Sequence, residues 1–364
     1  MEKENKKLNI VLRIIKIVLK VFLCILLIVL LIVFGLRLCN YINHKIKYKN
    51  GVNGTKYIDI NGQKQYVMMM GKNKDNPVIL YLHGGPSSPD TYITYSFSDY
   101  LTDDYTVISW DQRGCGRTYY KNEKIDPDNE SVSFEQALKD VDVLVDYIRN
   151  NFNQDKVIIM GHSYGSILGS TYVRNNPDKV SAYIGIGQMV SLKKADIYSY
   201  NDALNKAKAL GDDTTELESA YNVFINNINI QSLLKLRSLT SKYHPVEKEG
   251  DEMGLALFSP YAGINDLKWF FKQLGDINEY VELNKQLFDY VISFDATNET
   301  FEYKVPVLFI SGSSDWVCPV DSTREYYESI VAPKKDMITI DKYGHDVHVA
   351  NPKEFTYKVK EFLK

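Results

Sequence analysis

The sequence predicts an α/β fold: a mostly parallel central sheet with a helical cap insertion, preceded by one amino-terminal transmembrane helix. Three observations predict it. Apolar, strand-like runs alternate with helix-like segments, an order typical of a parallel sheet covered on both faces. The alternation stops between Ser191 and Thr300, where the pattern is helical, and then resumes. A run without charged residues, Val21 to Leu36, precedes the body of the chain.

These observations divide the chain into four parts. We expect a cytoplasmic amino terminus and transmembrane anchor at residues 1–40, a polar linker at 41–54, the sheet core at 55–190 and 301–364, and the cap at 191–300. A cap is favoured over a separate helical domain because the sheet pattern resumes after it. Open α/β sheets bind ligands beside the carboxyl ends of their strands, which such a cap would cover.

The apolar run near the amino terminus is long enough to cross a membrane. With Ile17–Leu19 added, and Lys20 reaching toward the headgroups, it covers about twenty residues, which span roughly 30 Å of hydrocarbon. A cleaved signal peptide would end in small residues, whereas this run ends Phe34-Gly-Leu-Arg-Leu-Cys39. A buried core helix is unexpected at the end of a chain whose remainder already accounts for a core.

Basic residues flank the apolar run unequally. Six precede it and four follow it, a bias toward a cytoplasmic amino terminus. We expect a single-pass protein of the cell membrane with its functional body outside the cell.

Charge and cysteine content limit the partners. Residues 51–364 hold 33 basic and 44 acidic residues, a net charge of −11, and such a body repels nucleic acid. The four cysteines lack metal-ligand or redox spacing, so we expect no metal and no cofactor. A disulfide between Cys115 and Cys318 stays open.

Periodicity and turn residues indicate the elements of the core and cap. Asn61-Gly62 between two strand-like runs is typical of a β-hairpin. Short apolar runs indicate buried strands, and apolar positions that share one helical face indicate a helix after Ser133. The expected strands are 56–60, 63–70, 77–82, 105–110, 157–160, 180–187, 305–310 and 337–340; the expected helices are 134–152, 167–176, 203–210, 216–225, 267–274 and 355–363.

One of these strands runs directly into Gly161-His-Ser163-Tyr-Gly165, and a helix-compatible segment follows. Strand, tight turn and helix are the context of a nucleophile elbow, in which the serine hydroxyl is exposed at the top of a sheet. We expect glycine two residues before and after the serine because a Cβ there would clash in so sharp a turn. Three common residues also arise by chance, so the prediction of a nucleophile depends on the remaining members of the site.

A serine hydroxyl is a weak nucleophile and requires a base and an acid that orients the base. His345 lies after the last expected strand and before the last helix, with His348 as its rival. Asp315 follows the strand 305–310, although an aspartate in a loop commonly caps or forms a turn. The order Ser163, Asp315, His345 is the one expected for this elbow, so we predict these three as the catalytic residues.

An oxyanion hole needs two backbone N–H groups. One would come from Tyr164, after the nucleophile, and one from Gly85 in His83-Gly-Gly-Pro86, which follows an earlier strand. An ordinary tight turn is the alternative explanation for the two glycines. His83 precedes the serine on the oxyanion side, so we expect it to support this loop and not to act as the base.

Taken together, several motifs resemble the proline iminopeptidase group of the α/β-hydrolase superfamily. The resemblance covers residues 55–190 and 303–364 and rests on His83-Gly-Gly-Pro86, Asp111-Gln-Arg-Gly-Cys-Gly-Arg117, Gly161-His-Ser-Tyr-Gly165, Gly312-Ser-Ser-Asp315 and Cys318-Pro319. It implies an α/β-hydrolase fold and a serine peptidase that removes an amino-terminal residue, often proline, with a cap that binds the free amine. It also implies that Asp111 and Arg113 brace the oxyanion loop.

Some positions depart from the family pattern. Ser87 stands where a further glycine is usual, His162-Ser-Tyr164 replaces glycine-serine-tryptophan, and a membrane anchor is uncommon in the group. These departures bear on proline preference and leave the hydrolase prediction intact. The sequence does not single out the cap acid that would hold a substrate amine; the candidates are Glu247, Glu249, Asp251 and Glu279.

The leading hypothesis is a membrane-anchored serine hydrolase that forms an acyl-enzyme, an aminopeptidase of the proline iminopeptidase type acting on small peptides. The alternative is a carboxylesterase or lipase-like enzyme that uses the same residues on an ester. A third hypothesis, from another class, is a non-catalytic surface-binding protein on a hydrolase fold.

Overall fold

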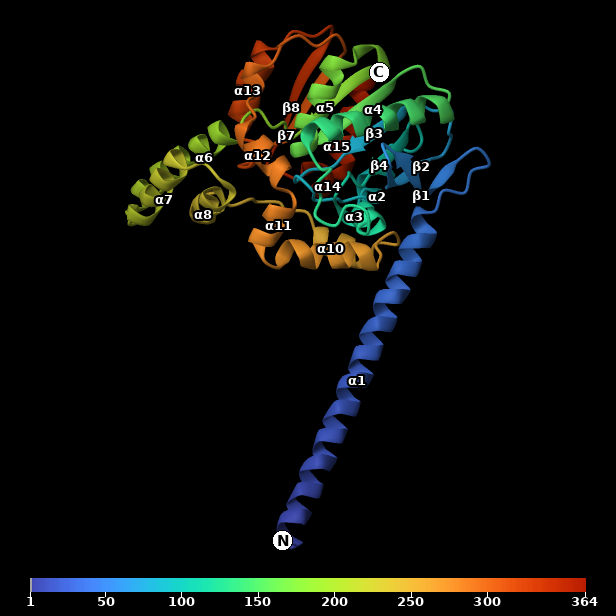
Figure 1. The fold of residues 1–364 in the computed structure, drawn as a ribbon, viewed down its shortest axis with the longest axis vertical. Coiled ribbons are helices and arrows are strands. Elements are labelled where there is room, and N and C mark those ends of the chain that lie inside the picture. The colour runs from blue at the N-terminus through green and yellow to red at the C-terminus, as the bar shows by residue number, and fades with distance from the viewer. Residues whose placement is uncertain (1) are drawn as a thin grey trace.

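The computed structural model describes residues 2–364, with side chains described for Lys7 and residues 9–364. Its first element is a single long helix, α1 (Glu2–His44), which projects from the body (Figure 1). Asn9–His44 is long and apolar enough to cross a membrane, and its most apolar window is not buried by the rest of the chain. Between α1 and the first strand only residues 45–51 lack regular structure, so this stretch is shorter than the 41–54 expected for the linker.

An eight-stranded sheet forms the core, in the order β1-β2-β4-β3-β5-β6-β7-β8. The strands β1 and β2 form an antiparallel hairpin at the edge, and the six strands from β4 to β8 are parallel, as the sequence predicts. Asn61 and Gly62 both have positive φ, which suits the right-handed twist of a two-residue hairpin. The bounds are β1 Val52–Ile60, β2 Gln63–Gly71, β3 Val78–Leu82, β4 Thr106–Trp110, β5 Val157–His162, β6 Val180–Ile186, β7 Val307–Gly312 and β8 Lys335–Ile340.

Helices cover both faces of the sheet, with a separate apolar cluster on each face. On one face the side chains of α4 and α5 pack against the strands, and on the other those of α2 and α15 do so. Every strand from β3 to β7 is buried almost throughout, which explains why these strands are continuous apolar runs. The core helices are α2 Tyr95–Ser98, α3 Gly116–Asn122, α4 Phe134–Asn151, α5 Tyr164–Asn175, α13 Val320–Ser329, α14 Val347–Ala350 and α15 Pro352–Leu363, with a 3₁₀ turn at Pro177–Lys179.

The helix α4 shows how local sequence sets an element of this core. Ser133 is its N-cap, and the Ser133 hydroxyl accepts a hydrogen bond from the Gln136 amide at 3.1 Å, which satisfies a donor that has no partner within the helix. Val141, Leu144 and Val145 then fall on one face and are fully buried. The predicted helix 134–152 is present with its end one residue earlier.

The regular elements of the cap between β6 and β7 are helices, joined by irregular segments such as residues 244–251. Its bounds are α6 Leu192–Leu210, α7 Thr215–Asn226, α8 Ile230–Thr240, α9 Glu252–Phe258, α10 Ile264–Leu274, α11 Ile277–Leu283 and α12 Lys285–Ser293, with 3₁₀ turns at Ser241–Tyr243 and Ala296–Asn298. Figure 1 shows α6 to α8 extending to one side, while α10 and α11 lie along the end of the body from which α1 leaves. Trp269 of α10 donates its indole N–H to the Ser87 carbonyl at 2.9 Å, so this part of the cap is tied to the loop after β3.

Cys115 and Cys318 are buried separately as free thiols. Cys115 lies beside the Gln112 carbonyl, whereas Cys318 lies 3.9 Å from the sulfur of Met189. The disulfide that the sequence leaves open is therefore not formed.

Candidate active site

Ser163 stands at the turn between β5 and α5 with φ 52° and ψ −119°, a conformation that non-glycine residues rarely adopt. The Ser163 amide donates to the Ile186 carbonyl at 3.0 Å, which ties the turn to the next strand. A Cβ at Gly161 would lie 2.2 Å from the Gly165 carbonyl oxygen, and one at Gly165 would lie 2.1 Å from the Leu82 oxygen. Glycine is required at 161 because the turn brings the Gly165 backbone close to it, and at 165 because the end of the neighbouring strand β3 lies against it.

His345 and Asp315 meet across the loops that follow β8 and β7. The His345 Nδ1–H donates to Asp315 Oδ2 at 2.9 Å. The other carboxylate oxygen accepts from the backbone amides of Val317 at 3.0 Å and Cys318 at 2.8 Å, so Asp315 is held at both oxygens. Burial acts to lower the pKa of His345, but the charge and hydrogen bond of Asp315 outweigh it, and the pKa lies above its ordinary value.

The rival histidine, His348, has other partners. It lines the same cavity as Ser163 but is almost fully buried, its Nε2 lies 3.1 Å from the Tyr81 hydroxyl, and burial lowers its pKa well below the usual value. His162, inside the elbow, lies between the two with its ring centroid 4.7 Å from that of His345 and 4.4 Å from that of His348. Burial lowers the pKa of His162 to about 4, so this ring is neutral near pH 7.

The loop after β3 approaches the serine at the position expected for an oxyanion hole. A Cβ at Gly84 would lie 3.1 Å from that of Ser163, whereas Gly85 has φ +116° and no room for a Cβ beside Ser88. Gly84 is thus the glycine that lets the backbone approach Ser163, and Gly85 the one that turns the chain. Among residues 2–364, neither the Gly85 amide nor the Tyr164 amide has a hydrogen-bond acceptor within the chain.

His83 and Asp111 connect this loop to the end of β4. The His83 Nδ1–H donates to the Gly84 carbonyl at 2.8 Å, and its Nε2 accepts from the Gln112 amide at 3.3 Å. This arrangement requires a neutral ring, and burial lowers the pKa of His83 to about 4. Asp111 accepts from the Thr91 hydroxyl at 2.6 Å.

Arg113 points away from the loop after β3. Its guanidinium pairs with the buried Asp140 of α4 at 2.6 Å and donates to the Asn61 carbonyl at 3.1 Å. It braces the β1–β2 hairpin against α4, so the role that the family resemblance implies for it does not match its contacts. The next arginine, Arg117, forms an ion pair with Asp266 of the cap.

Ser163 and His345 line the same cavity, of about 420 Å³. Gly84, Gly85 and His162 also line it from the core, and Glu252 and Phe270 line it from the cap. The pKa of the Glu252 carboxyl is raised to about 7. The larger cause is loss of water around the carboxyl, and the smaller cause is repulsion from the Asp346 charge. An ionisable cap residue with a perturbed pKa, next to a serine and a histidine, is typical of a functional site.

The sequence matches the family described as alpha/beta hydrolase fold over residues 77–352. The chain belongs to the α/β-hydrolase fold family. Among its relatives, the probable aminopeptidase YbaC of Bacillus subtilis (strain 168) is 27% identical over 332 residues, covering 85% of this chain and 96% of that protein. A proline iminopeptidase of Heyndrickxia coagulans is 25% identical over 329 residues, covering 84% and 97%.

Solved structures share the fold. A proline iminopeptidase-related protein from Thermus thermophilus has a TM-score of 0.57 at 16% identity, covering 86% of this chain and 97% of that one. A membrane phospholipase A, described as a bacterial virulence factor, has a TM-score of 0.53 at 17% identity, covering 100% and 98%. The predicted α/β-hydrolase fold and the resemblance to proline iminopeptidases are confirmed, and the protein is an α/β hydrolase with relatives named as aminopeptidases.

Two residues of this α/β-hydrolase site escaped the sequence analysis. Gly187, after β6, has φ +50°, and a Cβ there would lie 2.9 Å from His345 Cε1 and 3.0 Å from Asp315 Oδ2. Glu252 was not among the cap acids considered. Of those, Asp251 caps α9 by accepting from the Gly254 amide, and Glu247 pairs with Lys342 at 3.2 Å.

Two side-chain groups bring possible metal-ligand atoms within 4.8 Å of one another: His162, Asp346 and His348, and Asp315, Cys318 and His345. The second group contains the His345–Asp315 hydrogen bond. Burial raises the pKa of the Cys318 thiol well above its usual value, so it is a poor metal ligand. We assign no metal to either group.

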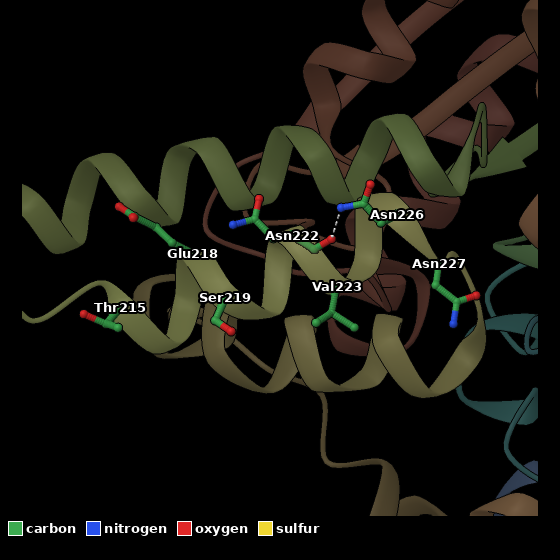
Figure 2. Close-up of a pocket in the computed structure, with 7 residues that line it drawn as sticks. All are labelled: Thr215, Glu218, Ser219, Asn222, Val223, Asn226 and Asn227. Atoms are coloured by element: carbon green, nitrogen blue, oxygen red, sulfur yellow. Dashed lines mark hydrogen bonds between the residues drawn. The ribbon is translucent and has the colours of Figure 1, made fainter.

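The hollow along α7 lies outside this site (Figure 2). It measures about 650 Å³ and is lined by Thr215, Glu218, Ser219, Asn222, Val223, Asn226 and Asn227, with Asn226 Nδ2 donating to the Asn222 carbonyl at 2.8 Å. None of the residues around Ser163 lines it, and we assign it no role in the reaction.

Proposed function

We propose that the protein is a membrane-anchored serine hydrolase of the aminopeptidase type. One observation carries the proposal: Ser163, the His345 ring held by Asp315, and the cap carboxylate of Glu252 line a single cavity. The first two are the parts of an acyl-transfer site, and the third is a negative charge placed to bind a substrate ammonium group.

The chemistry follows from these positions. Ser163 Oγ attacks the substrate carbonyl carbon while His345 Nε2 takes its proton, and Asp315 stabilises the imidazolium through Nδ1. The Tyr164 and Gly85 amides donate to the oxyanion. His345 then protonates the leaving amine, and the acyl-enzyme is hydrolysed by water that His345 deprotonates in turn.

Glu252 supports the choice of aminopeptidase over other hydrolases. A carboxylate that lines the same cavity as the nucleophile favours substrates that carry a positive charge. The aminopeptidase and proline iminopeptidase names of the relatives agree with this choice.

The helix α1 supports membrane anchoring. No residue of its most apolar window is buried by the rest of the chain, and leaving so many apolar side chains in water is costly. We propose that the amino terminus is cytoplasmic and the catalytic body extracellular. Protease added to intact cells should remove the body, whereas a body that survives until the cells are lysed contradicts this orientation.

A pair of substrates tests the aminopeptidase proposal. We expect hydrolysis of L-aminoacyl p-nitroanilides and much slower hydrolysis of their N-acetylated forms, with no hydrolysis by Ser163→Ala. Glu252→Gln should lower kcat/KM for the free-amine substrate about thirtyfold, since a charge-assisted contact contributes ~2 kcal/mol. Glu249→Gln, a change at an exposed glutamate outside the cavity, is the matched control.

Two results decide among the alternatives. Equal hydrolysis of free and blocked substrates, or a strong preference for esters, favours the carboxylesterase or lipase-like hypothesis. Absence of Ser163 labelling by a fluorophosphonate favours the non-catalytic one.

A further inference from the structure

Six large apolar side chains are exposed on two neighbouring cap helices. We refer to them as the apolar cap face: Met253, Leu257, Ile264, Leu267, Phe271 and Leu274. The four on α10 are spaced three or four residues apart and form one stripe, while Asp266 and Trp269 on the opposite side are buried. A contiguous exposed patch of this kind marks an interaction surface.

The amino-terminal helix fixes where this face lies. Val33, Arg37, Asn40 and His44 are partly buried and recur every three or four residues, so one side of α1 is turned toward the body. Asn40 Nδ2 donates to the Phe258 carbonyl at 3.0 Å, and the Arg37 guanidinium donates to the Ala262 carbonyl. These two carbonyls bracket the junction of α9 and α10.

The uncharged segment of α1 ends at Leu36, one residue before Arg37. The α9–α10 junction therefore lies level with the point where α1 would leave the hydrocarbon core. Figure 1 shows α10 and α11 at the end of the body from which α1 leaves. After α1, Lys45, Lys47 and Lys49 are exposed.

An apolar cavity of about 460 Å³ lies behind this face. Arg37 lines it from α1, and Met253, Ala256, Leu257 and Leu267 are among the residues that line it from the cap. Four residues line both this cavity and the one that contains Ser163, so the two adjoin: Tyr92, Ile93, Glu252 and Phe270.

We propose that the apolar cap face rests on the lipid bilayer and that the adjoining cavity binds the hydrocarbon chain of an amphiphilic substrate. The chain enters from the membrane side, and the scissile carbonyl reaches Ser163 past the shared wall of the two cavities. The substrate class is thus a membrane-resident aminoacyl or peptidyl compound that carries a long apolar chain. This inference rests on the anchoring and the serine-hydrolase chemistry proposed above.

Tryptophan quenching tests the docking of the face. The full chain is incorporated into nanodiscs that contain phosphatidylglycerol and lipids brominated on their acyl chains. Phe271→Trp is compared with Val331→Trp, because the two native side chains are similarly exposed, at 62% and 65%. Val331 lies before β8, at the end of the sheet opposite to the cap.

We expect strong quenching of the Phe271→Trp fluorescence and little change for Val331→Trp, after subtraction of the wild-type signal. Equal quenching at both positions overturns the docking of this face. If the full chain does not co-purify with the nanodiscs, the proposal that α1 is a membrane anchor is wrong. This outcome is observed before quenching is measured, so it is distinguished from a failure of the docking proposal.

Alkyl fluorophosphonates test the chain-binding cavity. Their reaction forms a bond between Ser163 Oγ and phosphorus, expels fluoride and passes the serine proton to His345, so it does not depend on amine recognition. Labelling rates in nanodiscs are measured with an ethyl and a dodecyl probe. Ala256→Trp fills the cavity, and Val331→Trp is the control.

We expect the dodecyl-to-ethyl rate ratio to fall about tenfold or more in Ala256→Trp, because each buried methylene contributes about fourfold to binding. Val331→Trp should keep the wild-type ratio, which controls for partition of the long probe into the bilayer. An unchanged ratio in Ala256→Trp overturns the cavity assignment. Absence of labelling by both probes overturns the serine-hydrolase proposal, and this inference with it.

Discussion

The sheet core and the cap face the same cavity, but they hold their residues in different ways. Ser163 and Asp315 are at most 6% exposed, and backbone hydrogen bonds fix each of them at the end of a buried strand. Glu252, in contrast, lies on the seven-residue helix α9, which has no fully buried residue, and Phe270 is half-buried on α10. The groups placed for bond breaking are therefore buried and held by backbone hydrogen bonds, whereas the cap residues that face the cavity come from helices at the surface.

This difference separates two kinds of effect. A change in the core should slow the chemical step for every substrate, whereas a change in the cap should alter the binding of particular substrates. Variants in the core and in the cap, measured with several substrates, show whether the two kinds of effect are in fact separate and how large each one is.

The largest effect is expected at Asp315. Asp315→Asn keeps the shape of the side chain but removes the charge that holds His345 in the productive tautomer, so kcat should fall about 10⁴-fold. The loss should be the same for free-amine, blocked and ester substrates, as measured by steady-state kinetics. The Tm should change little, and this result would show that the loss of kcat arises in the chemical step and not from unfolding.

A second aspartate provides the control for this prediction. Asp341 follows β8 and accepts a hydrogen bond from the Ser313 hydroxyl at the surface, at 3.1 Å. Asp341→Asn should leave kcat within about threefold of wild type, since surface changes usually cost little. If the two variants lose activity equally, the His345–Asp315 pair does not act as a unit.

Gly187 should show the next largest effect. A Cβ there would press on His345 and Asp315 at about 3 Å, and displacing catalytic groups by ~1 Å can cost about a hundredfold in rate. Gly187→Ala should therefore lower kcat about a hundredfold for every substrate.

Gly211 separates this contact from backbone strain. Like Gly187 it has positive φ, at +75°, but a Cβ there would meet nothing within 4 Å. Gly211→Ala at the end of α6 should cost stability, seen as a lower Tm, and leave kcat unchanged. Equal losses of kcat in both variants would mean that strain, and not contact with the His345–Asp315 pair, is responsible.

The same contrast explains what the sequence could predict. The grouping of Ser163, Asp315 and His345 followed from buried apolar runs, because the carboxyl ends of parallel strands share one edge of the sheet. Their positions thus depend on a regular pattern that a sequence displays directly. The limits of the strands were predicted to within a few residues for the same reason.

The cap offered no such pattern. Its acids occur on polar segments that look alike in the sequence. Glu252, rather than Glu249 or Asp251, reaches the cavity because α9 packs against α1 and Ser259, just after α9, bonds to the Tyr92 carbonyl of the loop after β3. Gly187 was missed because a glycine after a strand is common, and its importance depends on two side chains more than 120 residues later. Such contacts are set by tertiary packing, which periodicity does not report.

The smallest predicted effect concerns pH, and it compares one group from each region. His345 must be neutral to act as a base, and its pKa is raised, so kcat/KM falls as the pH drops through that value. Glu252 must be ionised to bind an ammonium group, and its pKa of about 7 means that its negative charge is lost as the pH falls below neutrality. One unit below its pKa, the ionised fraction of Glu252 is reduced about tenfold.

For a free-amine substrate, log kcat/KM should therefore fall with a slope approaching two on the acid side. Glu252→Gln should reduce that slope to one, and a substrate without an amine should show a slope of one with either protein. A slope of one for the wild type on free-amine substrates would mean that the cap carboxylate does not bind the amine. A slope of two that persists in Glu252→Gln would assign the second proton to the core, and the separation between catalysis by the core and amine binding by the cap would then be wrong.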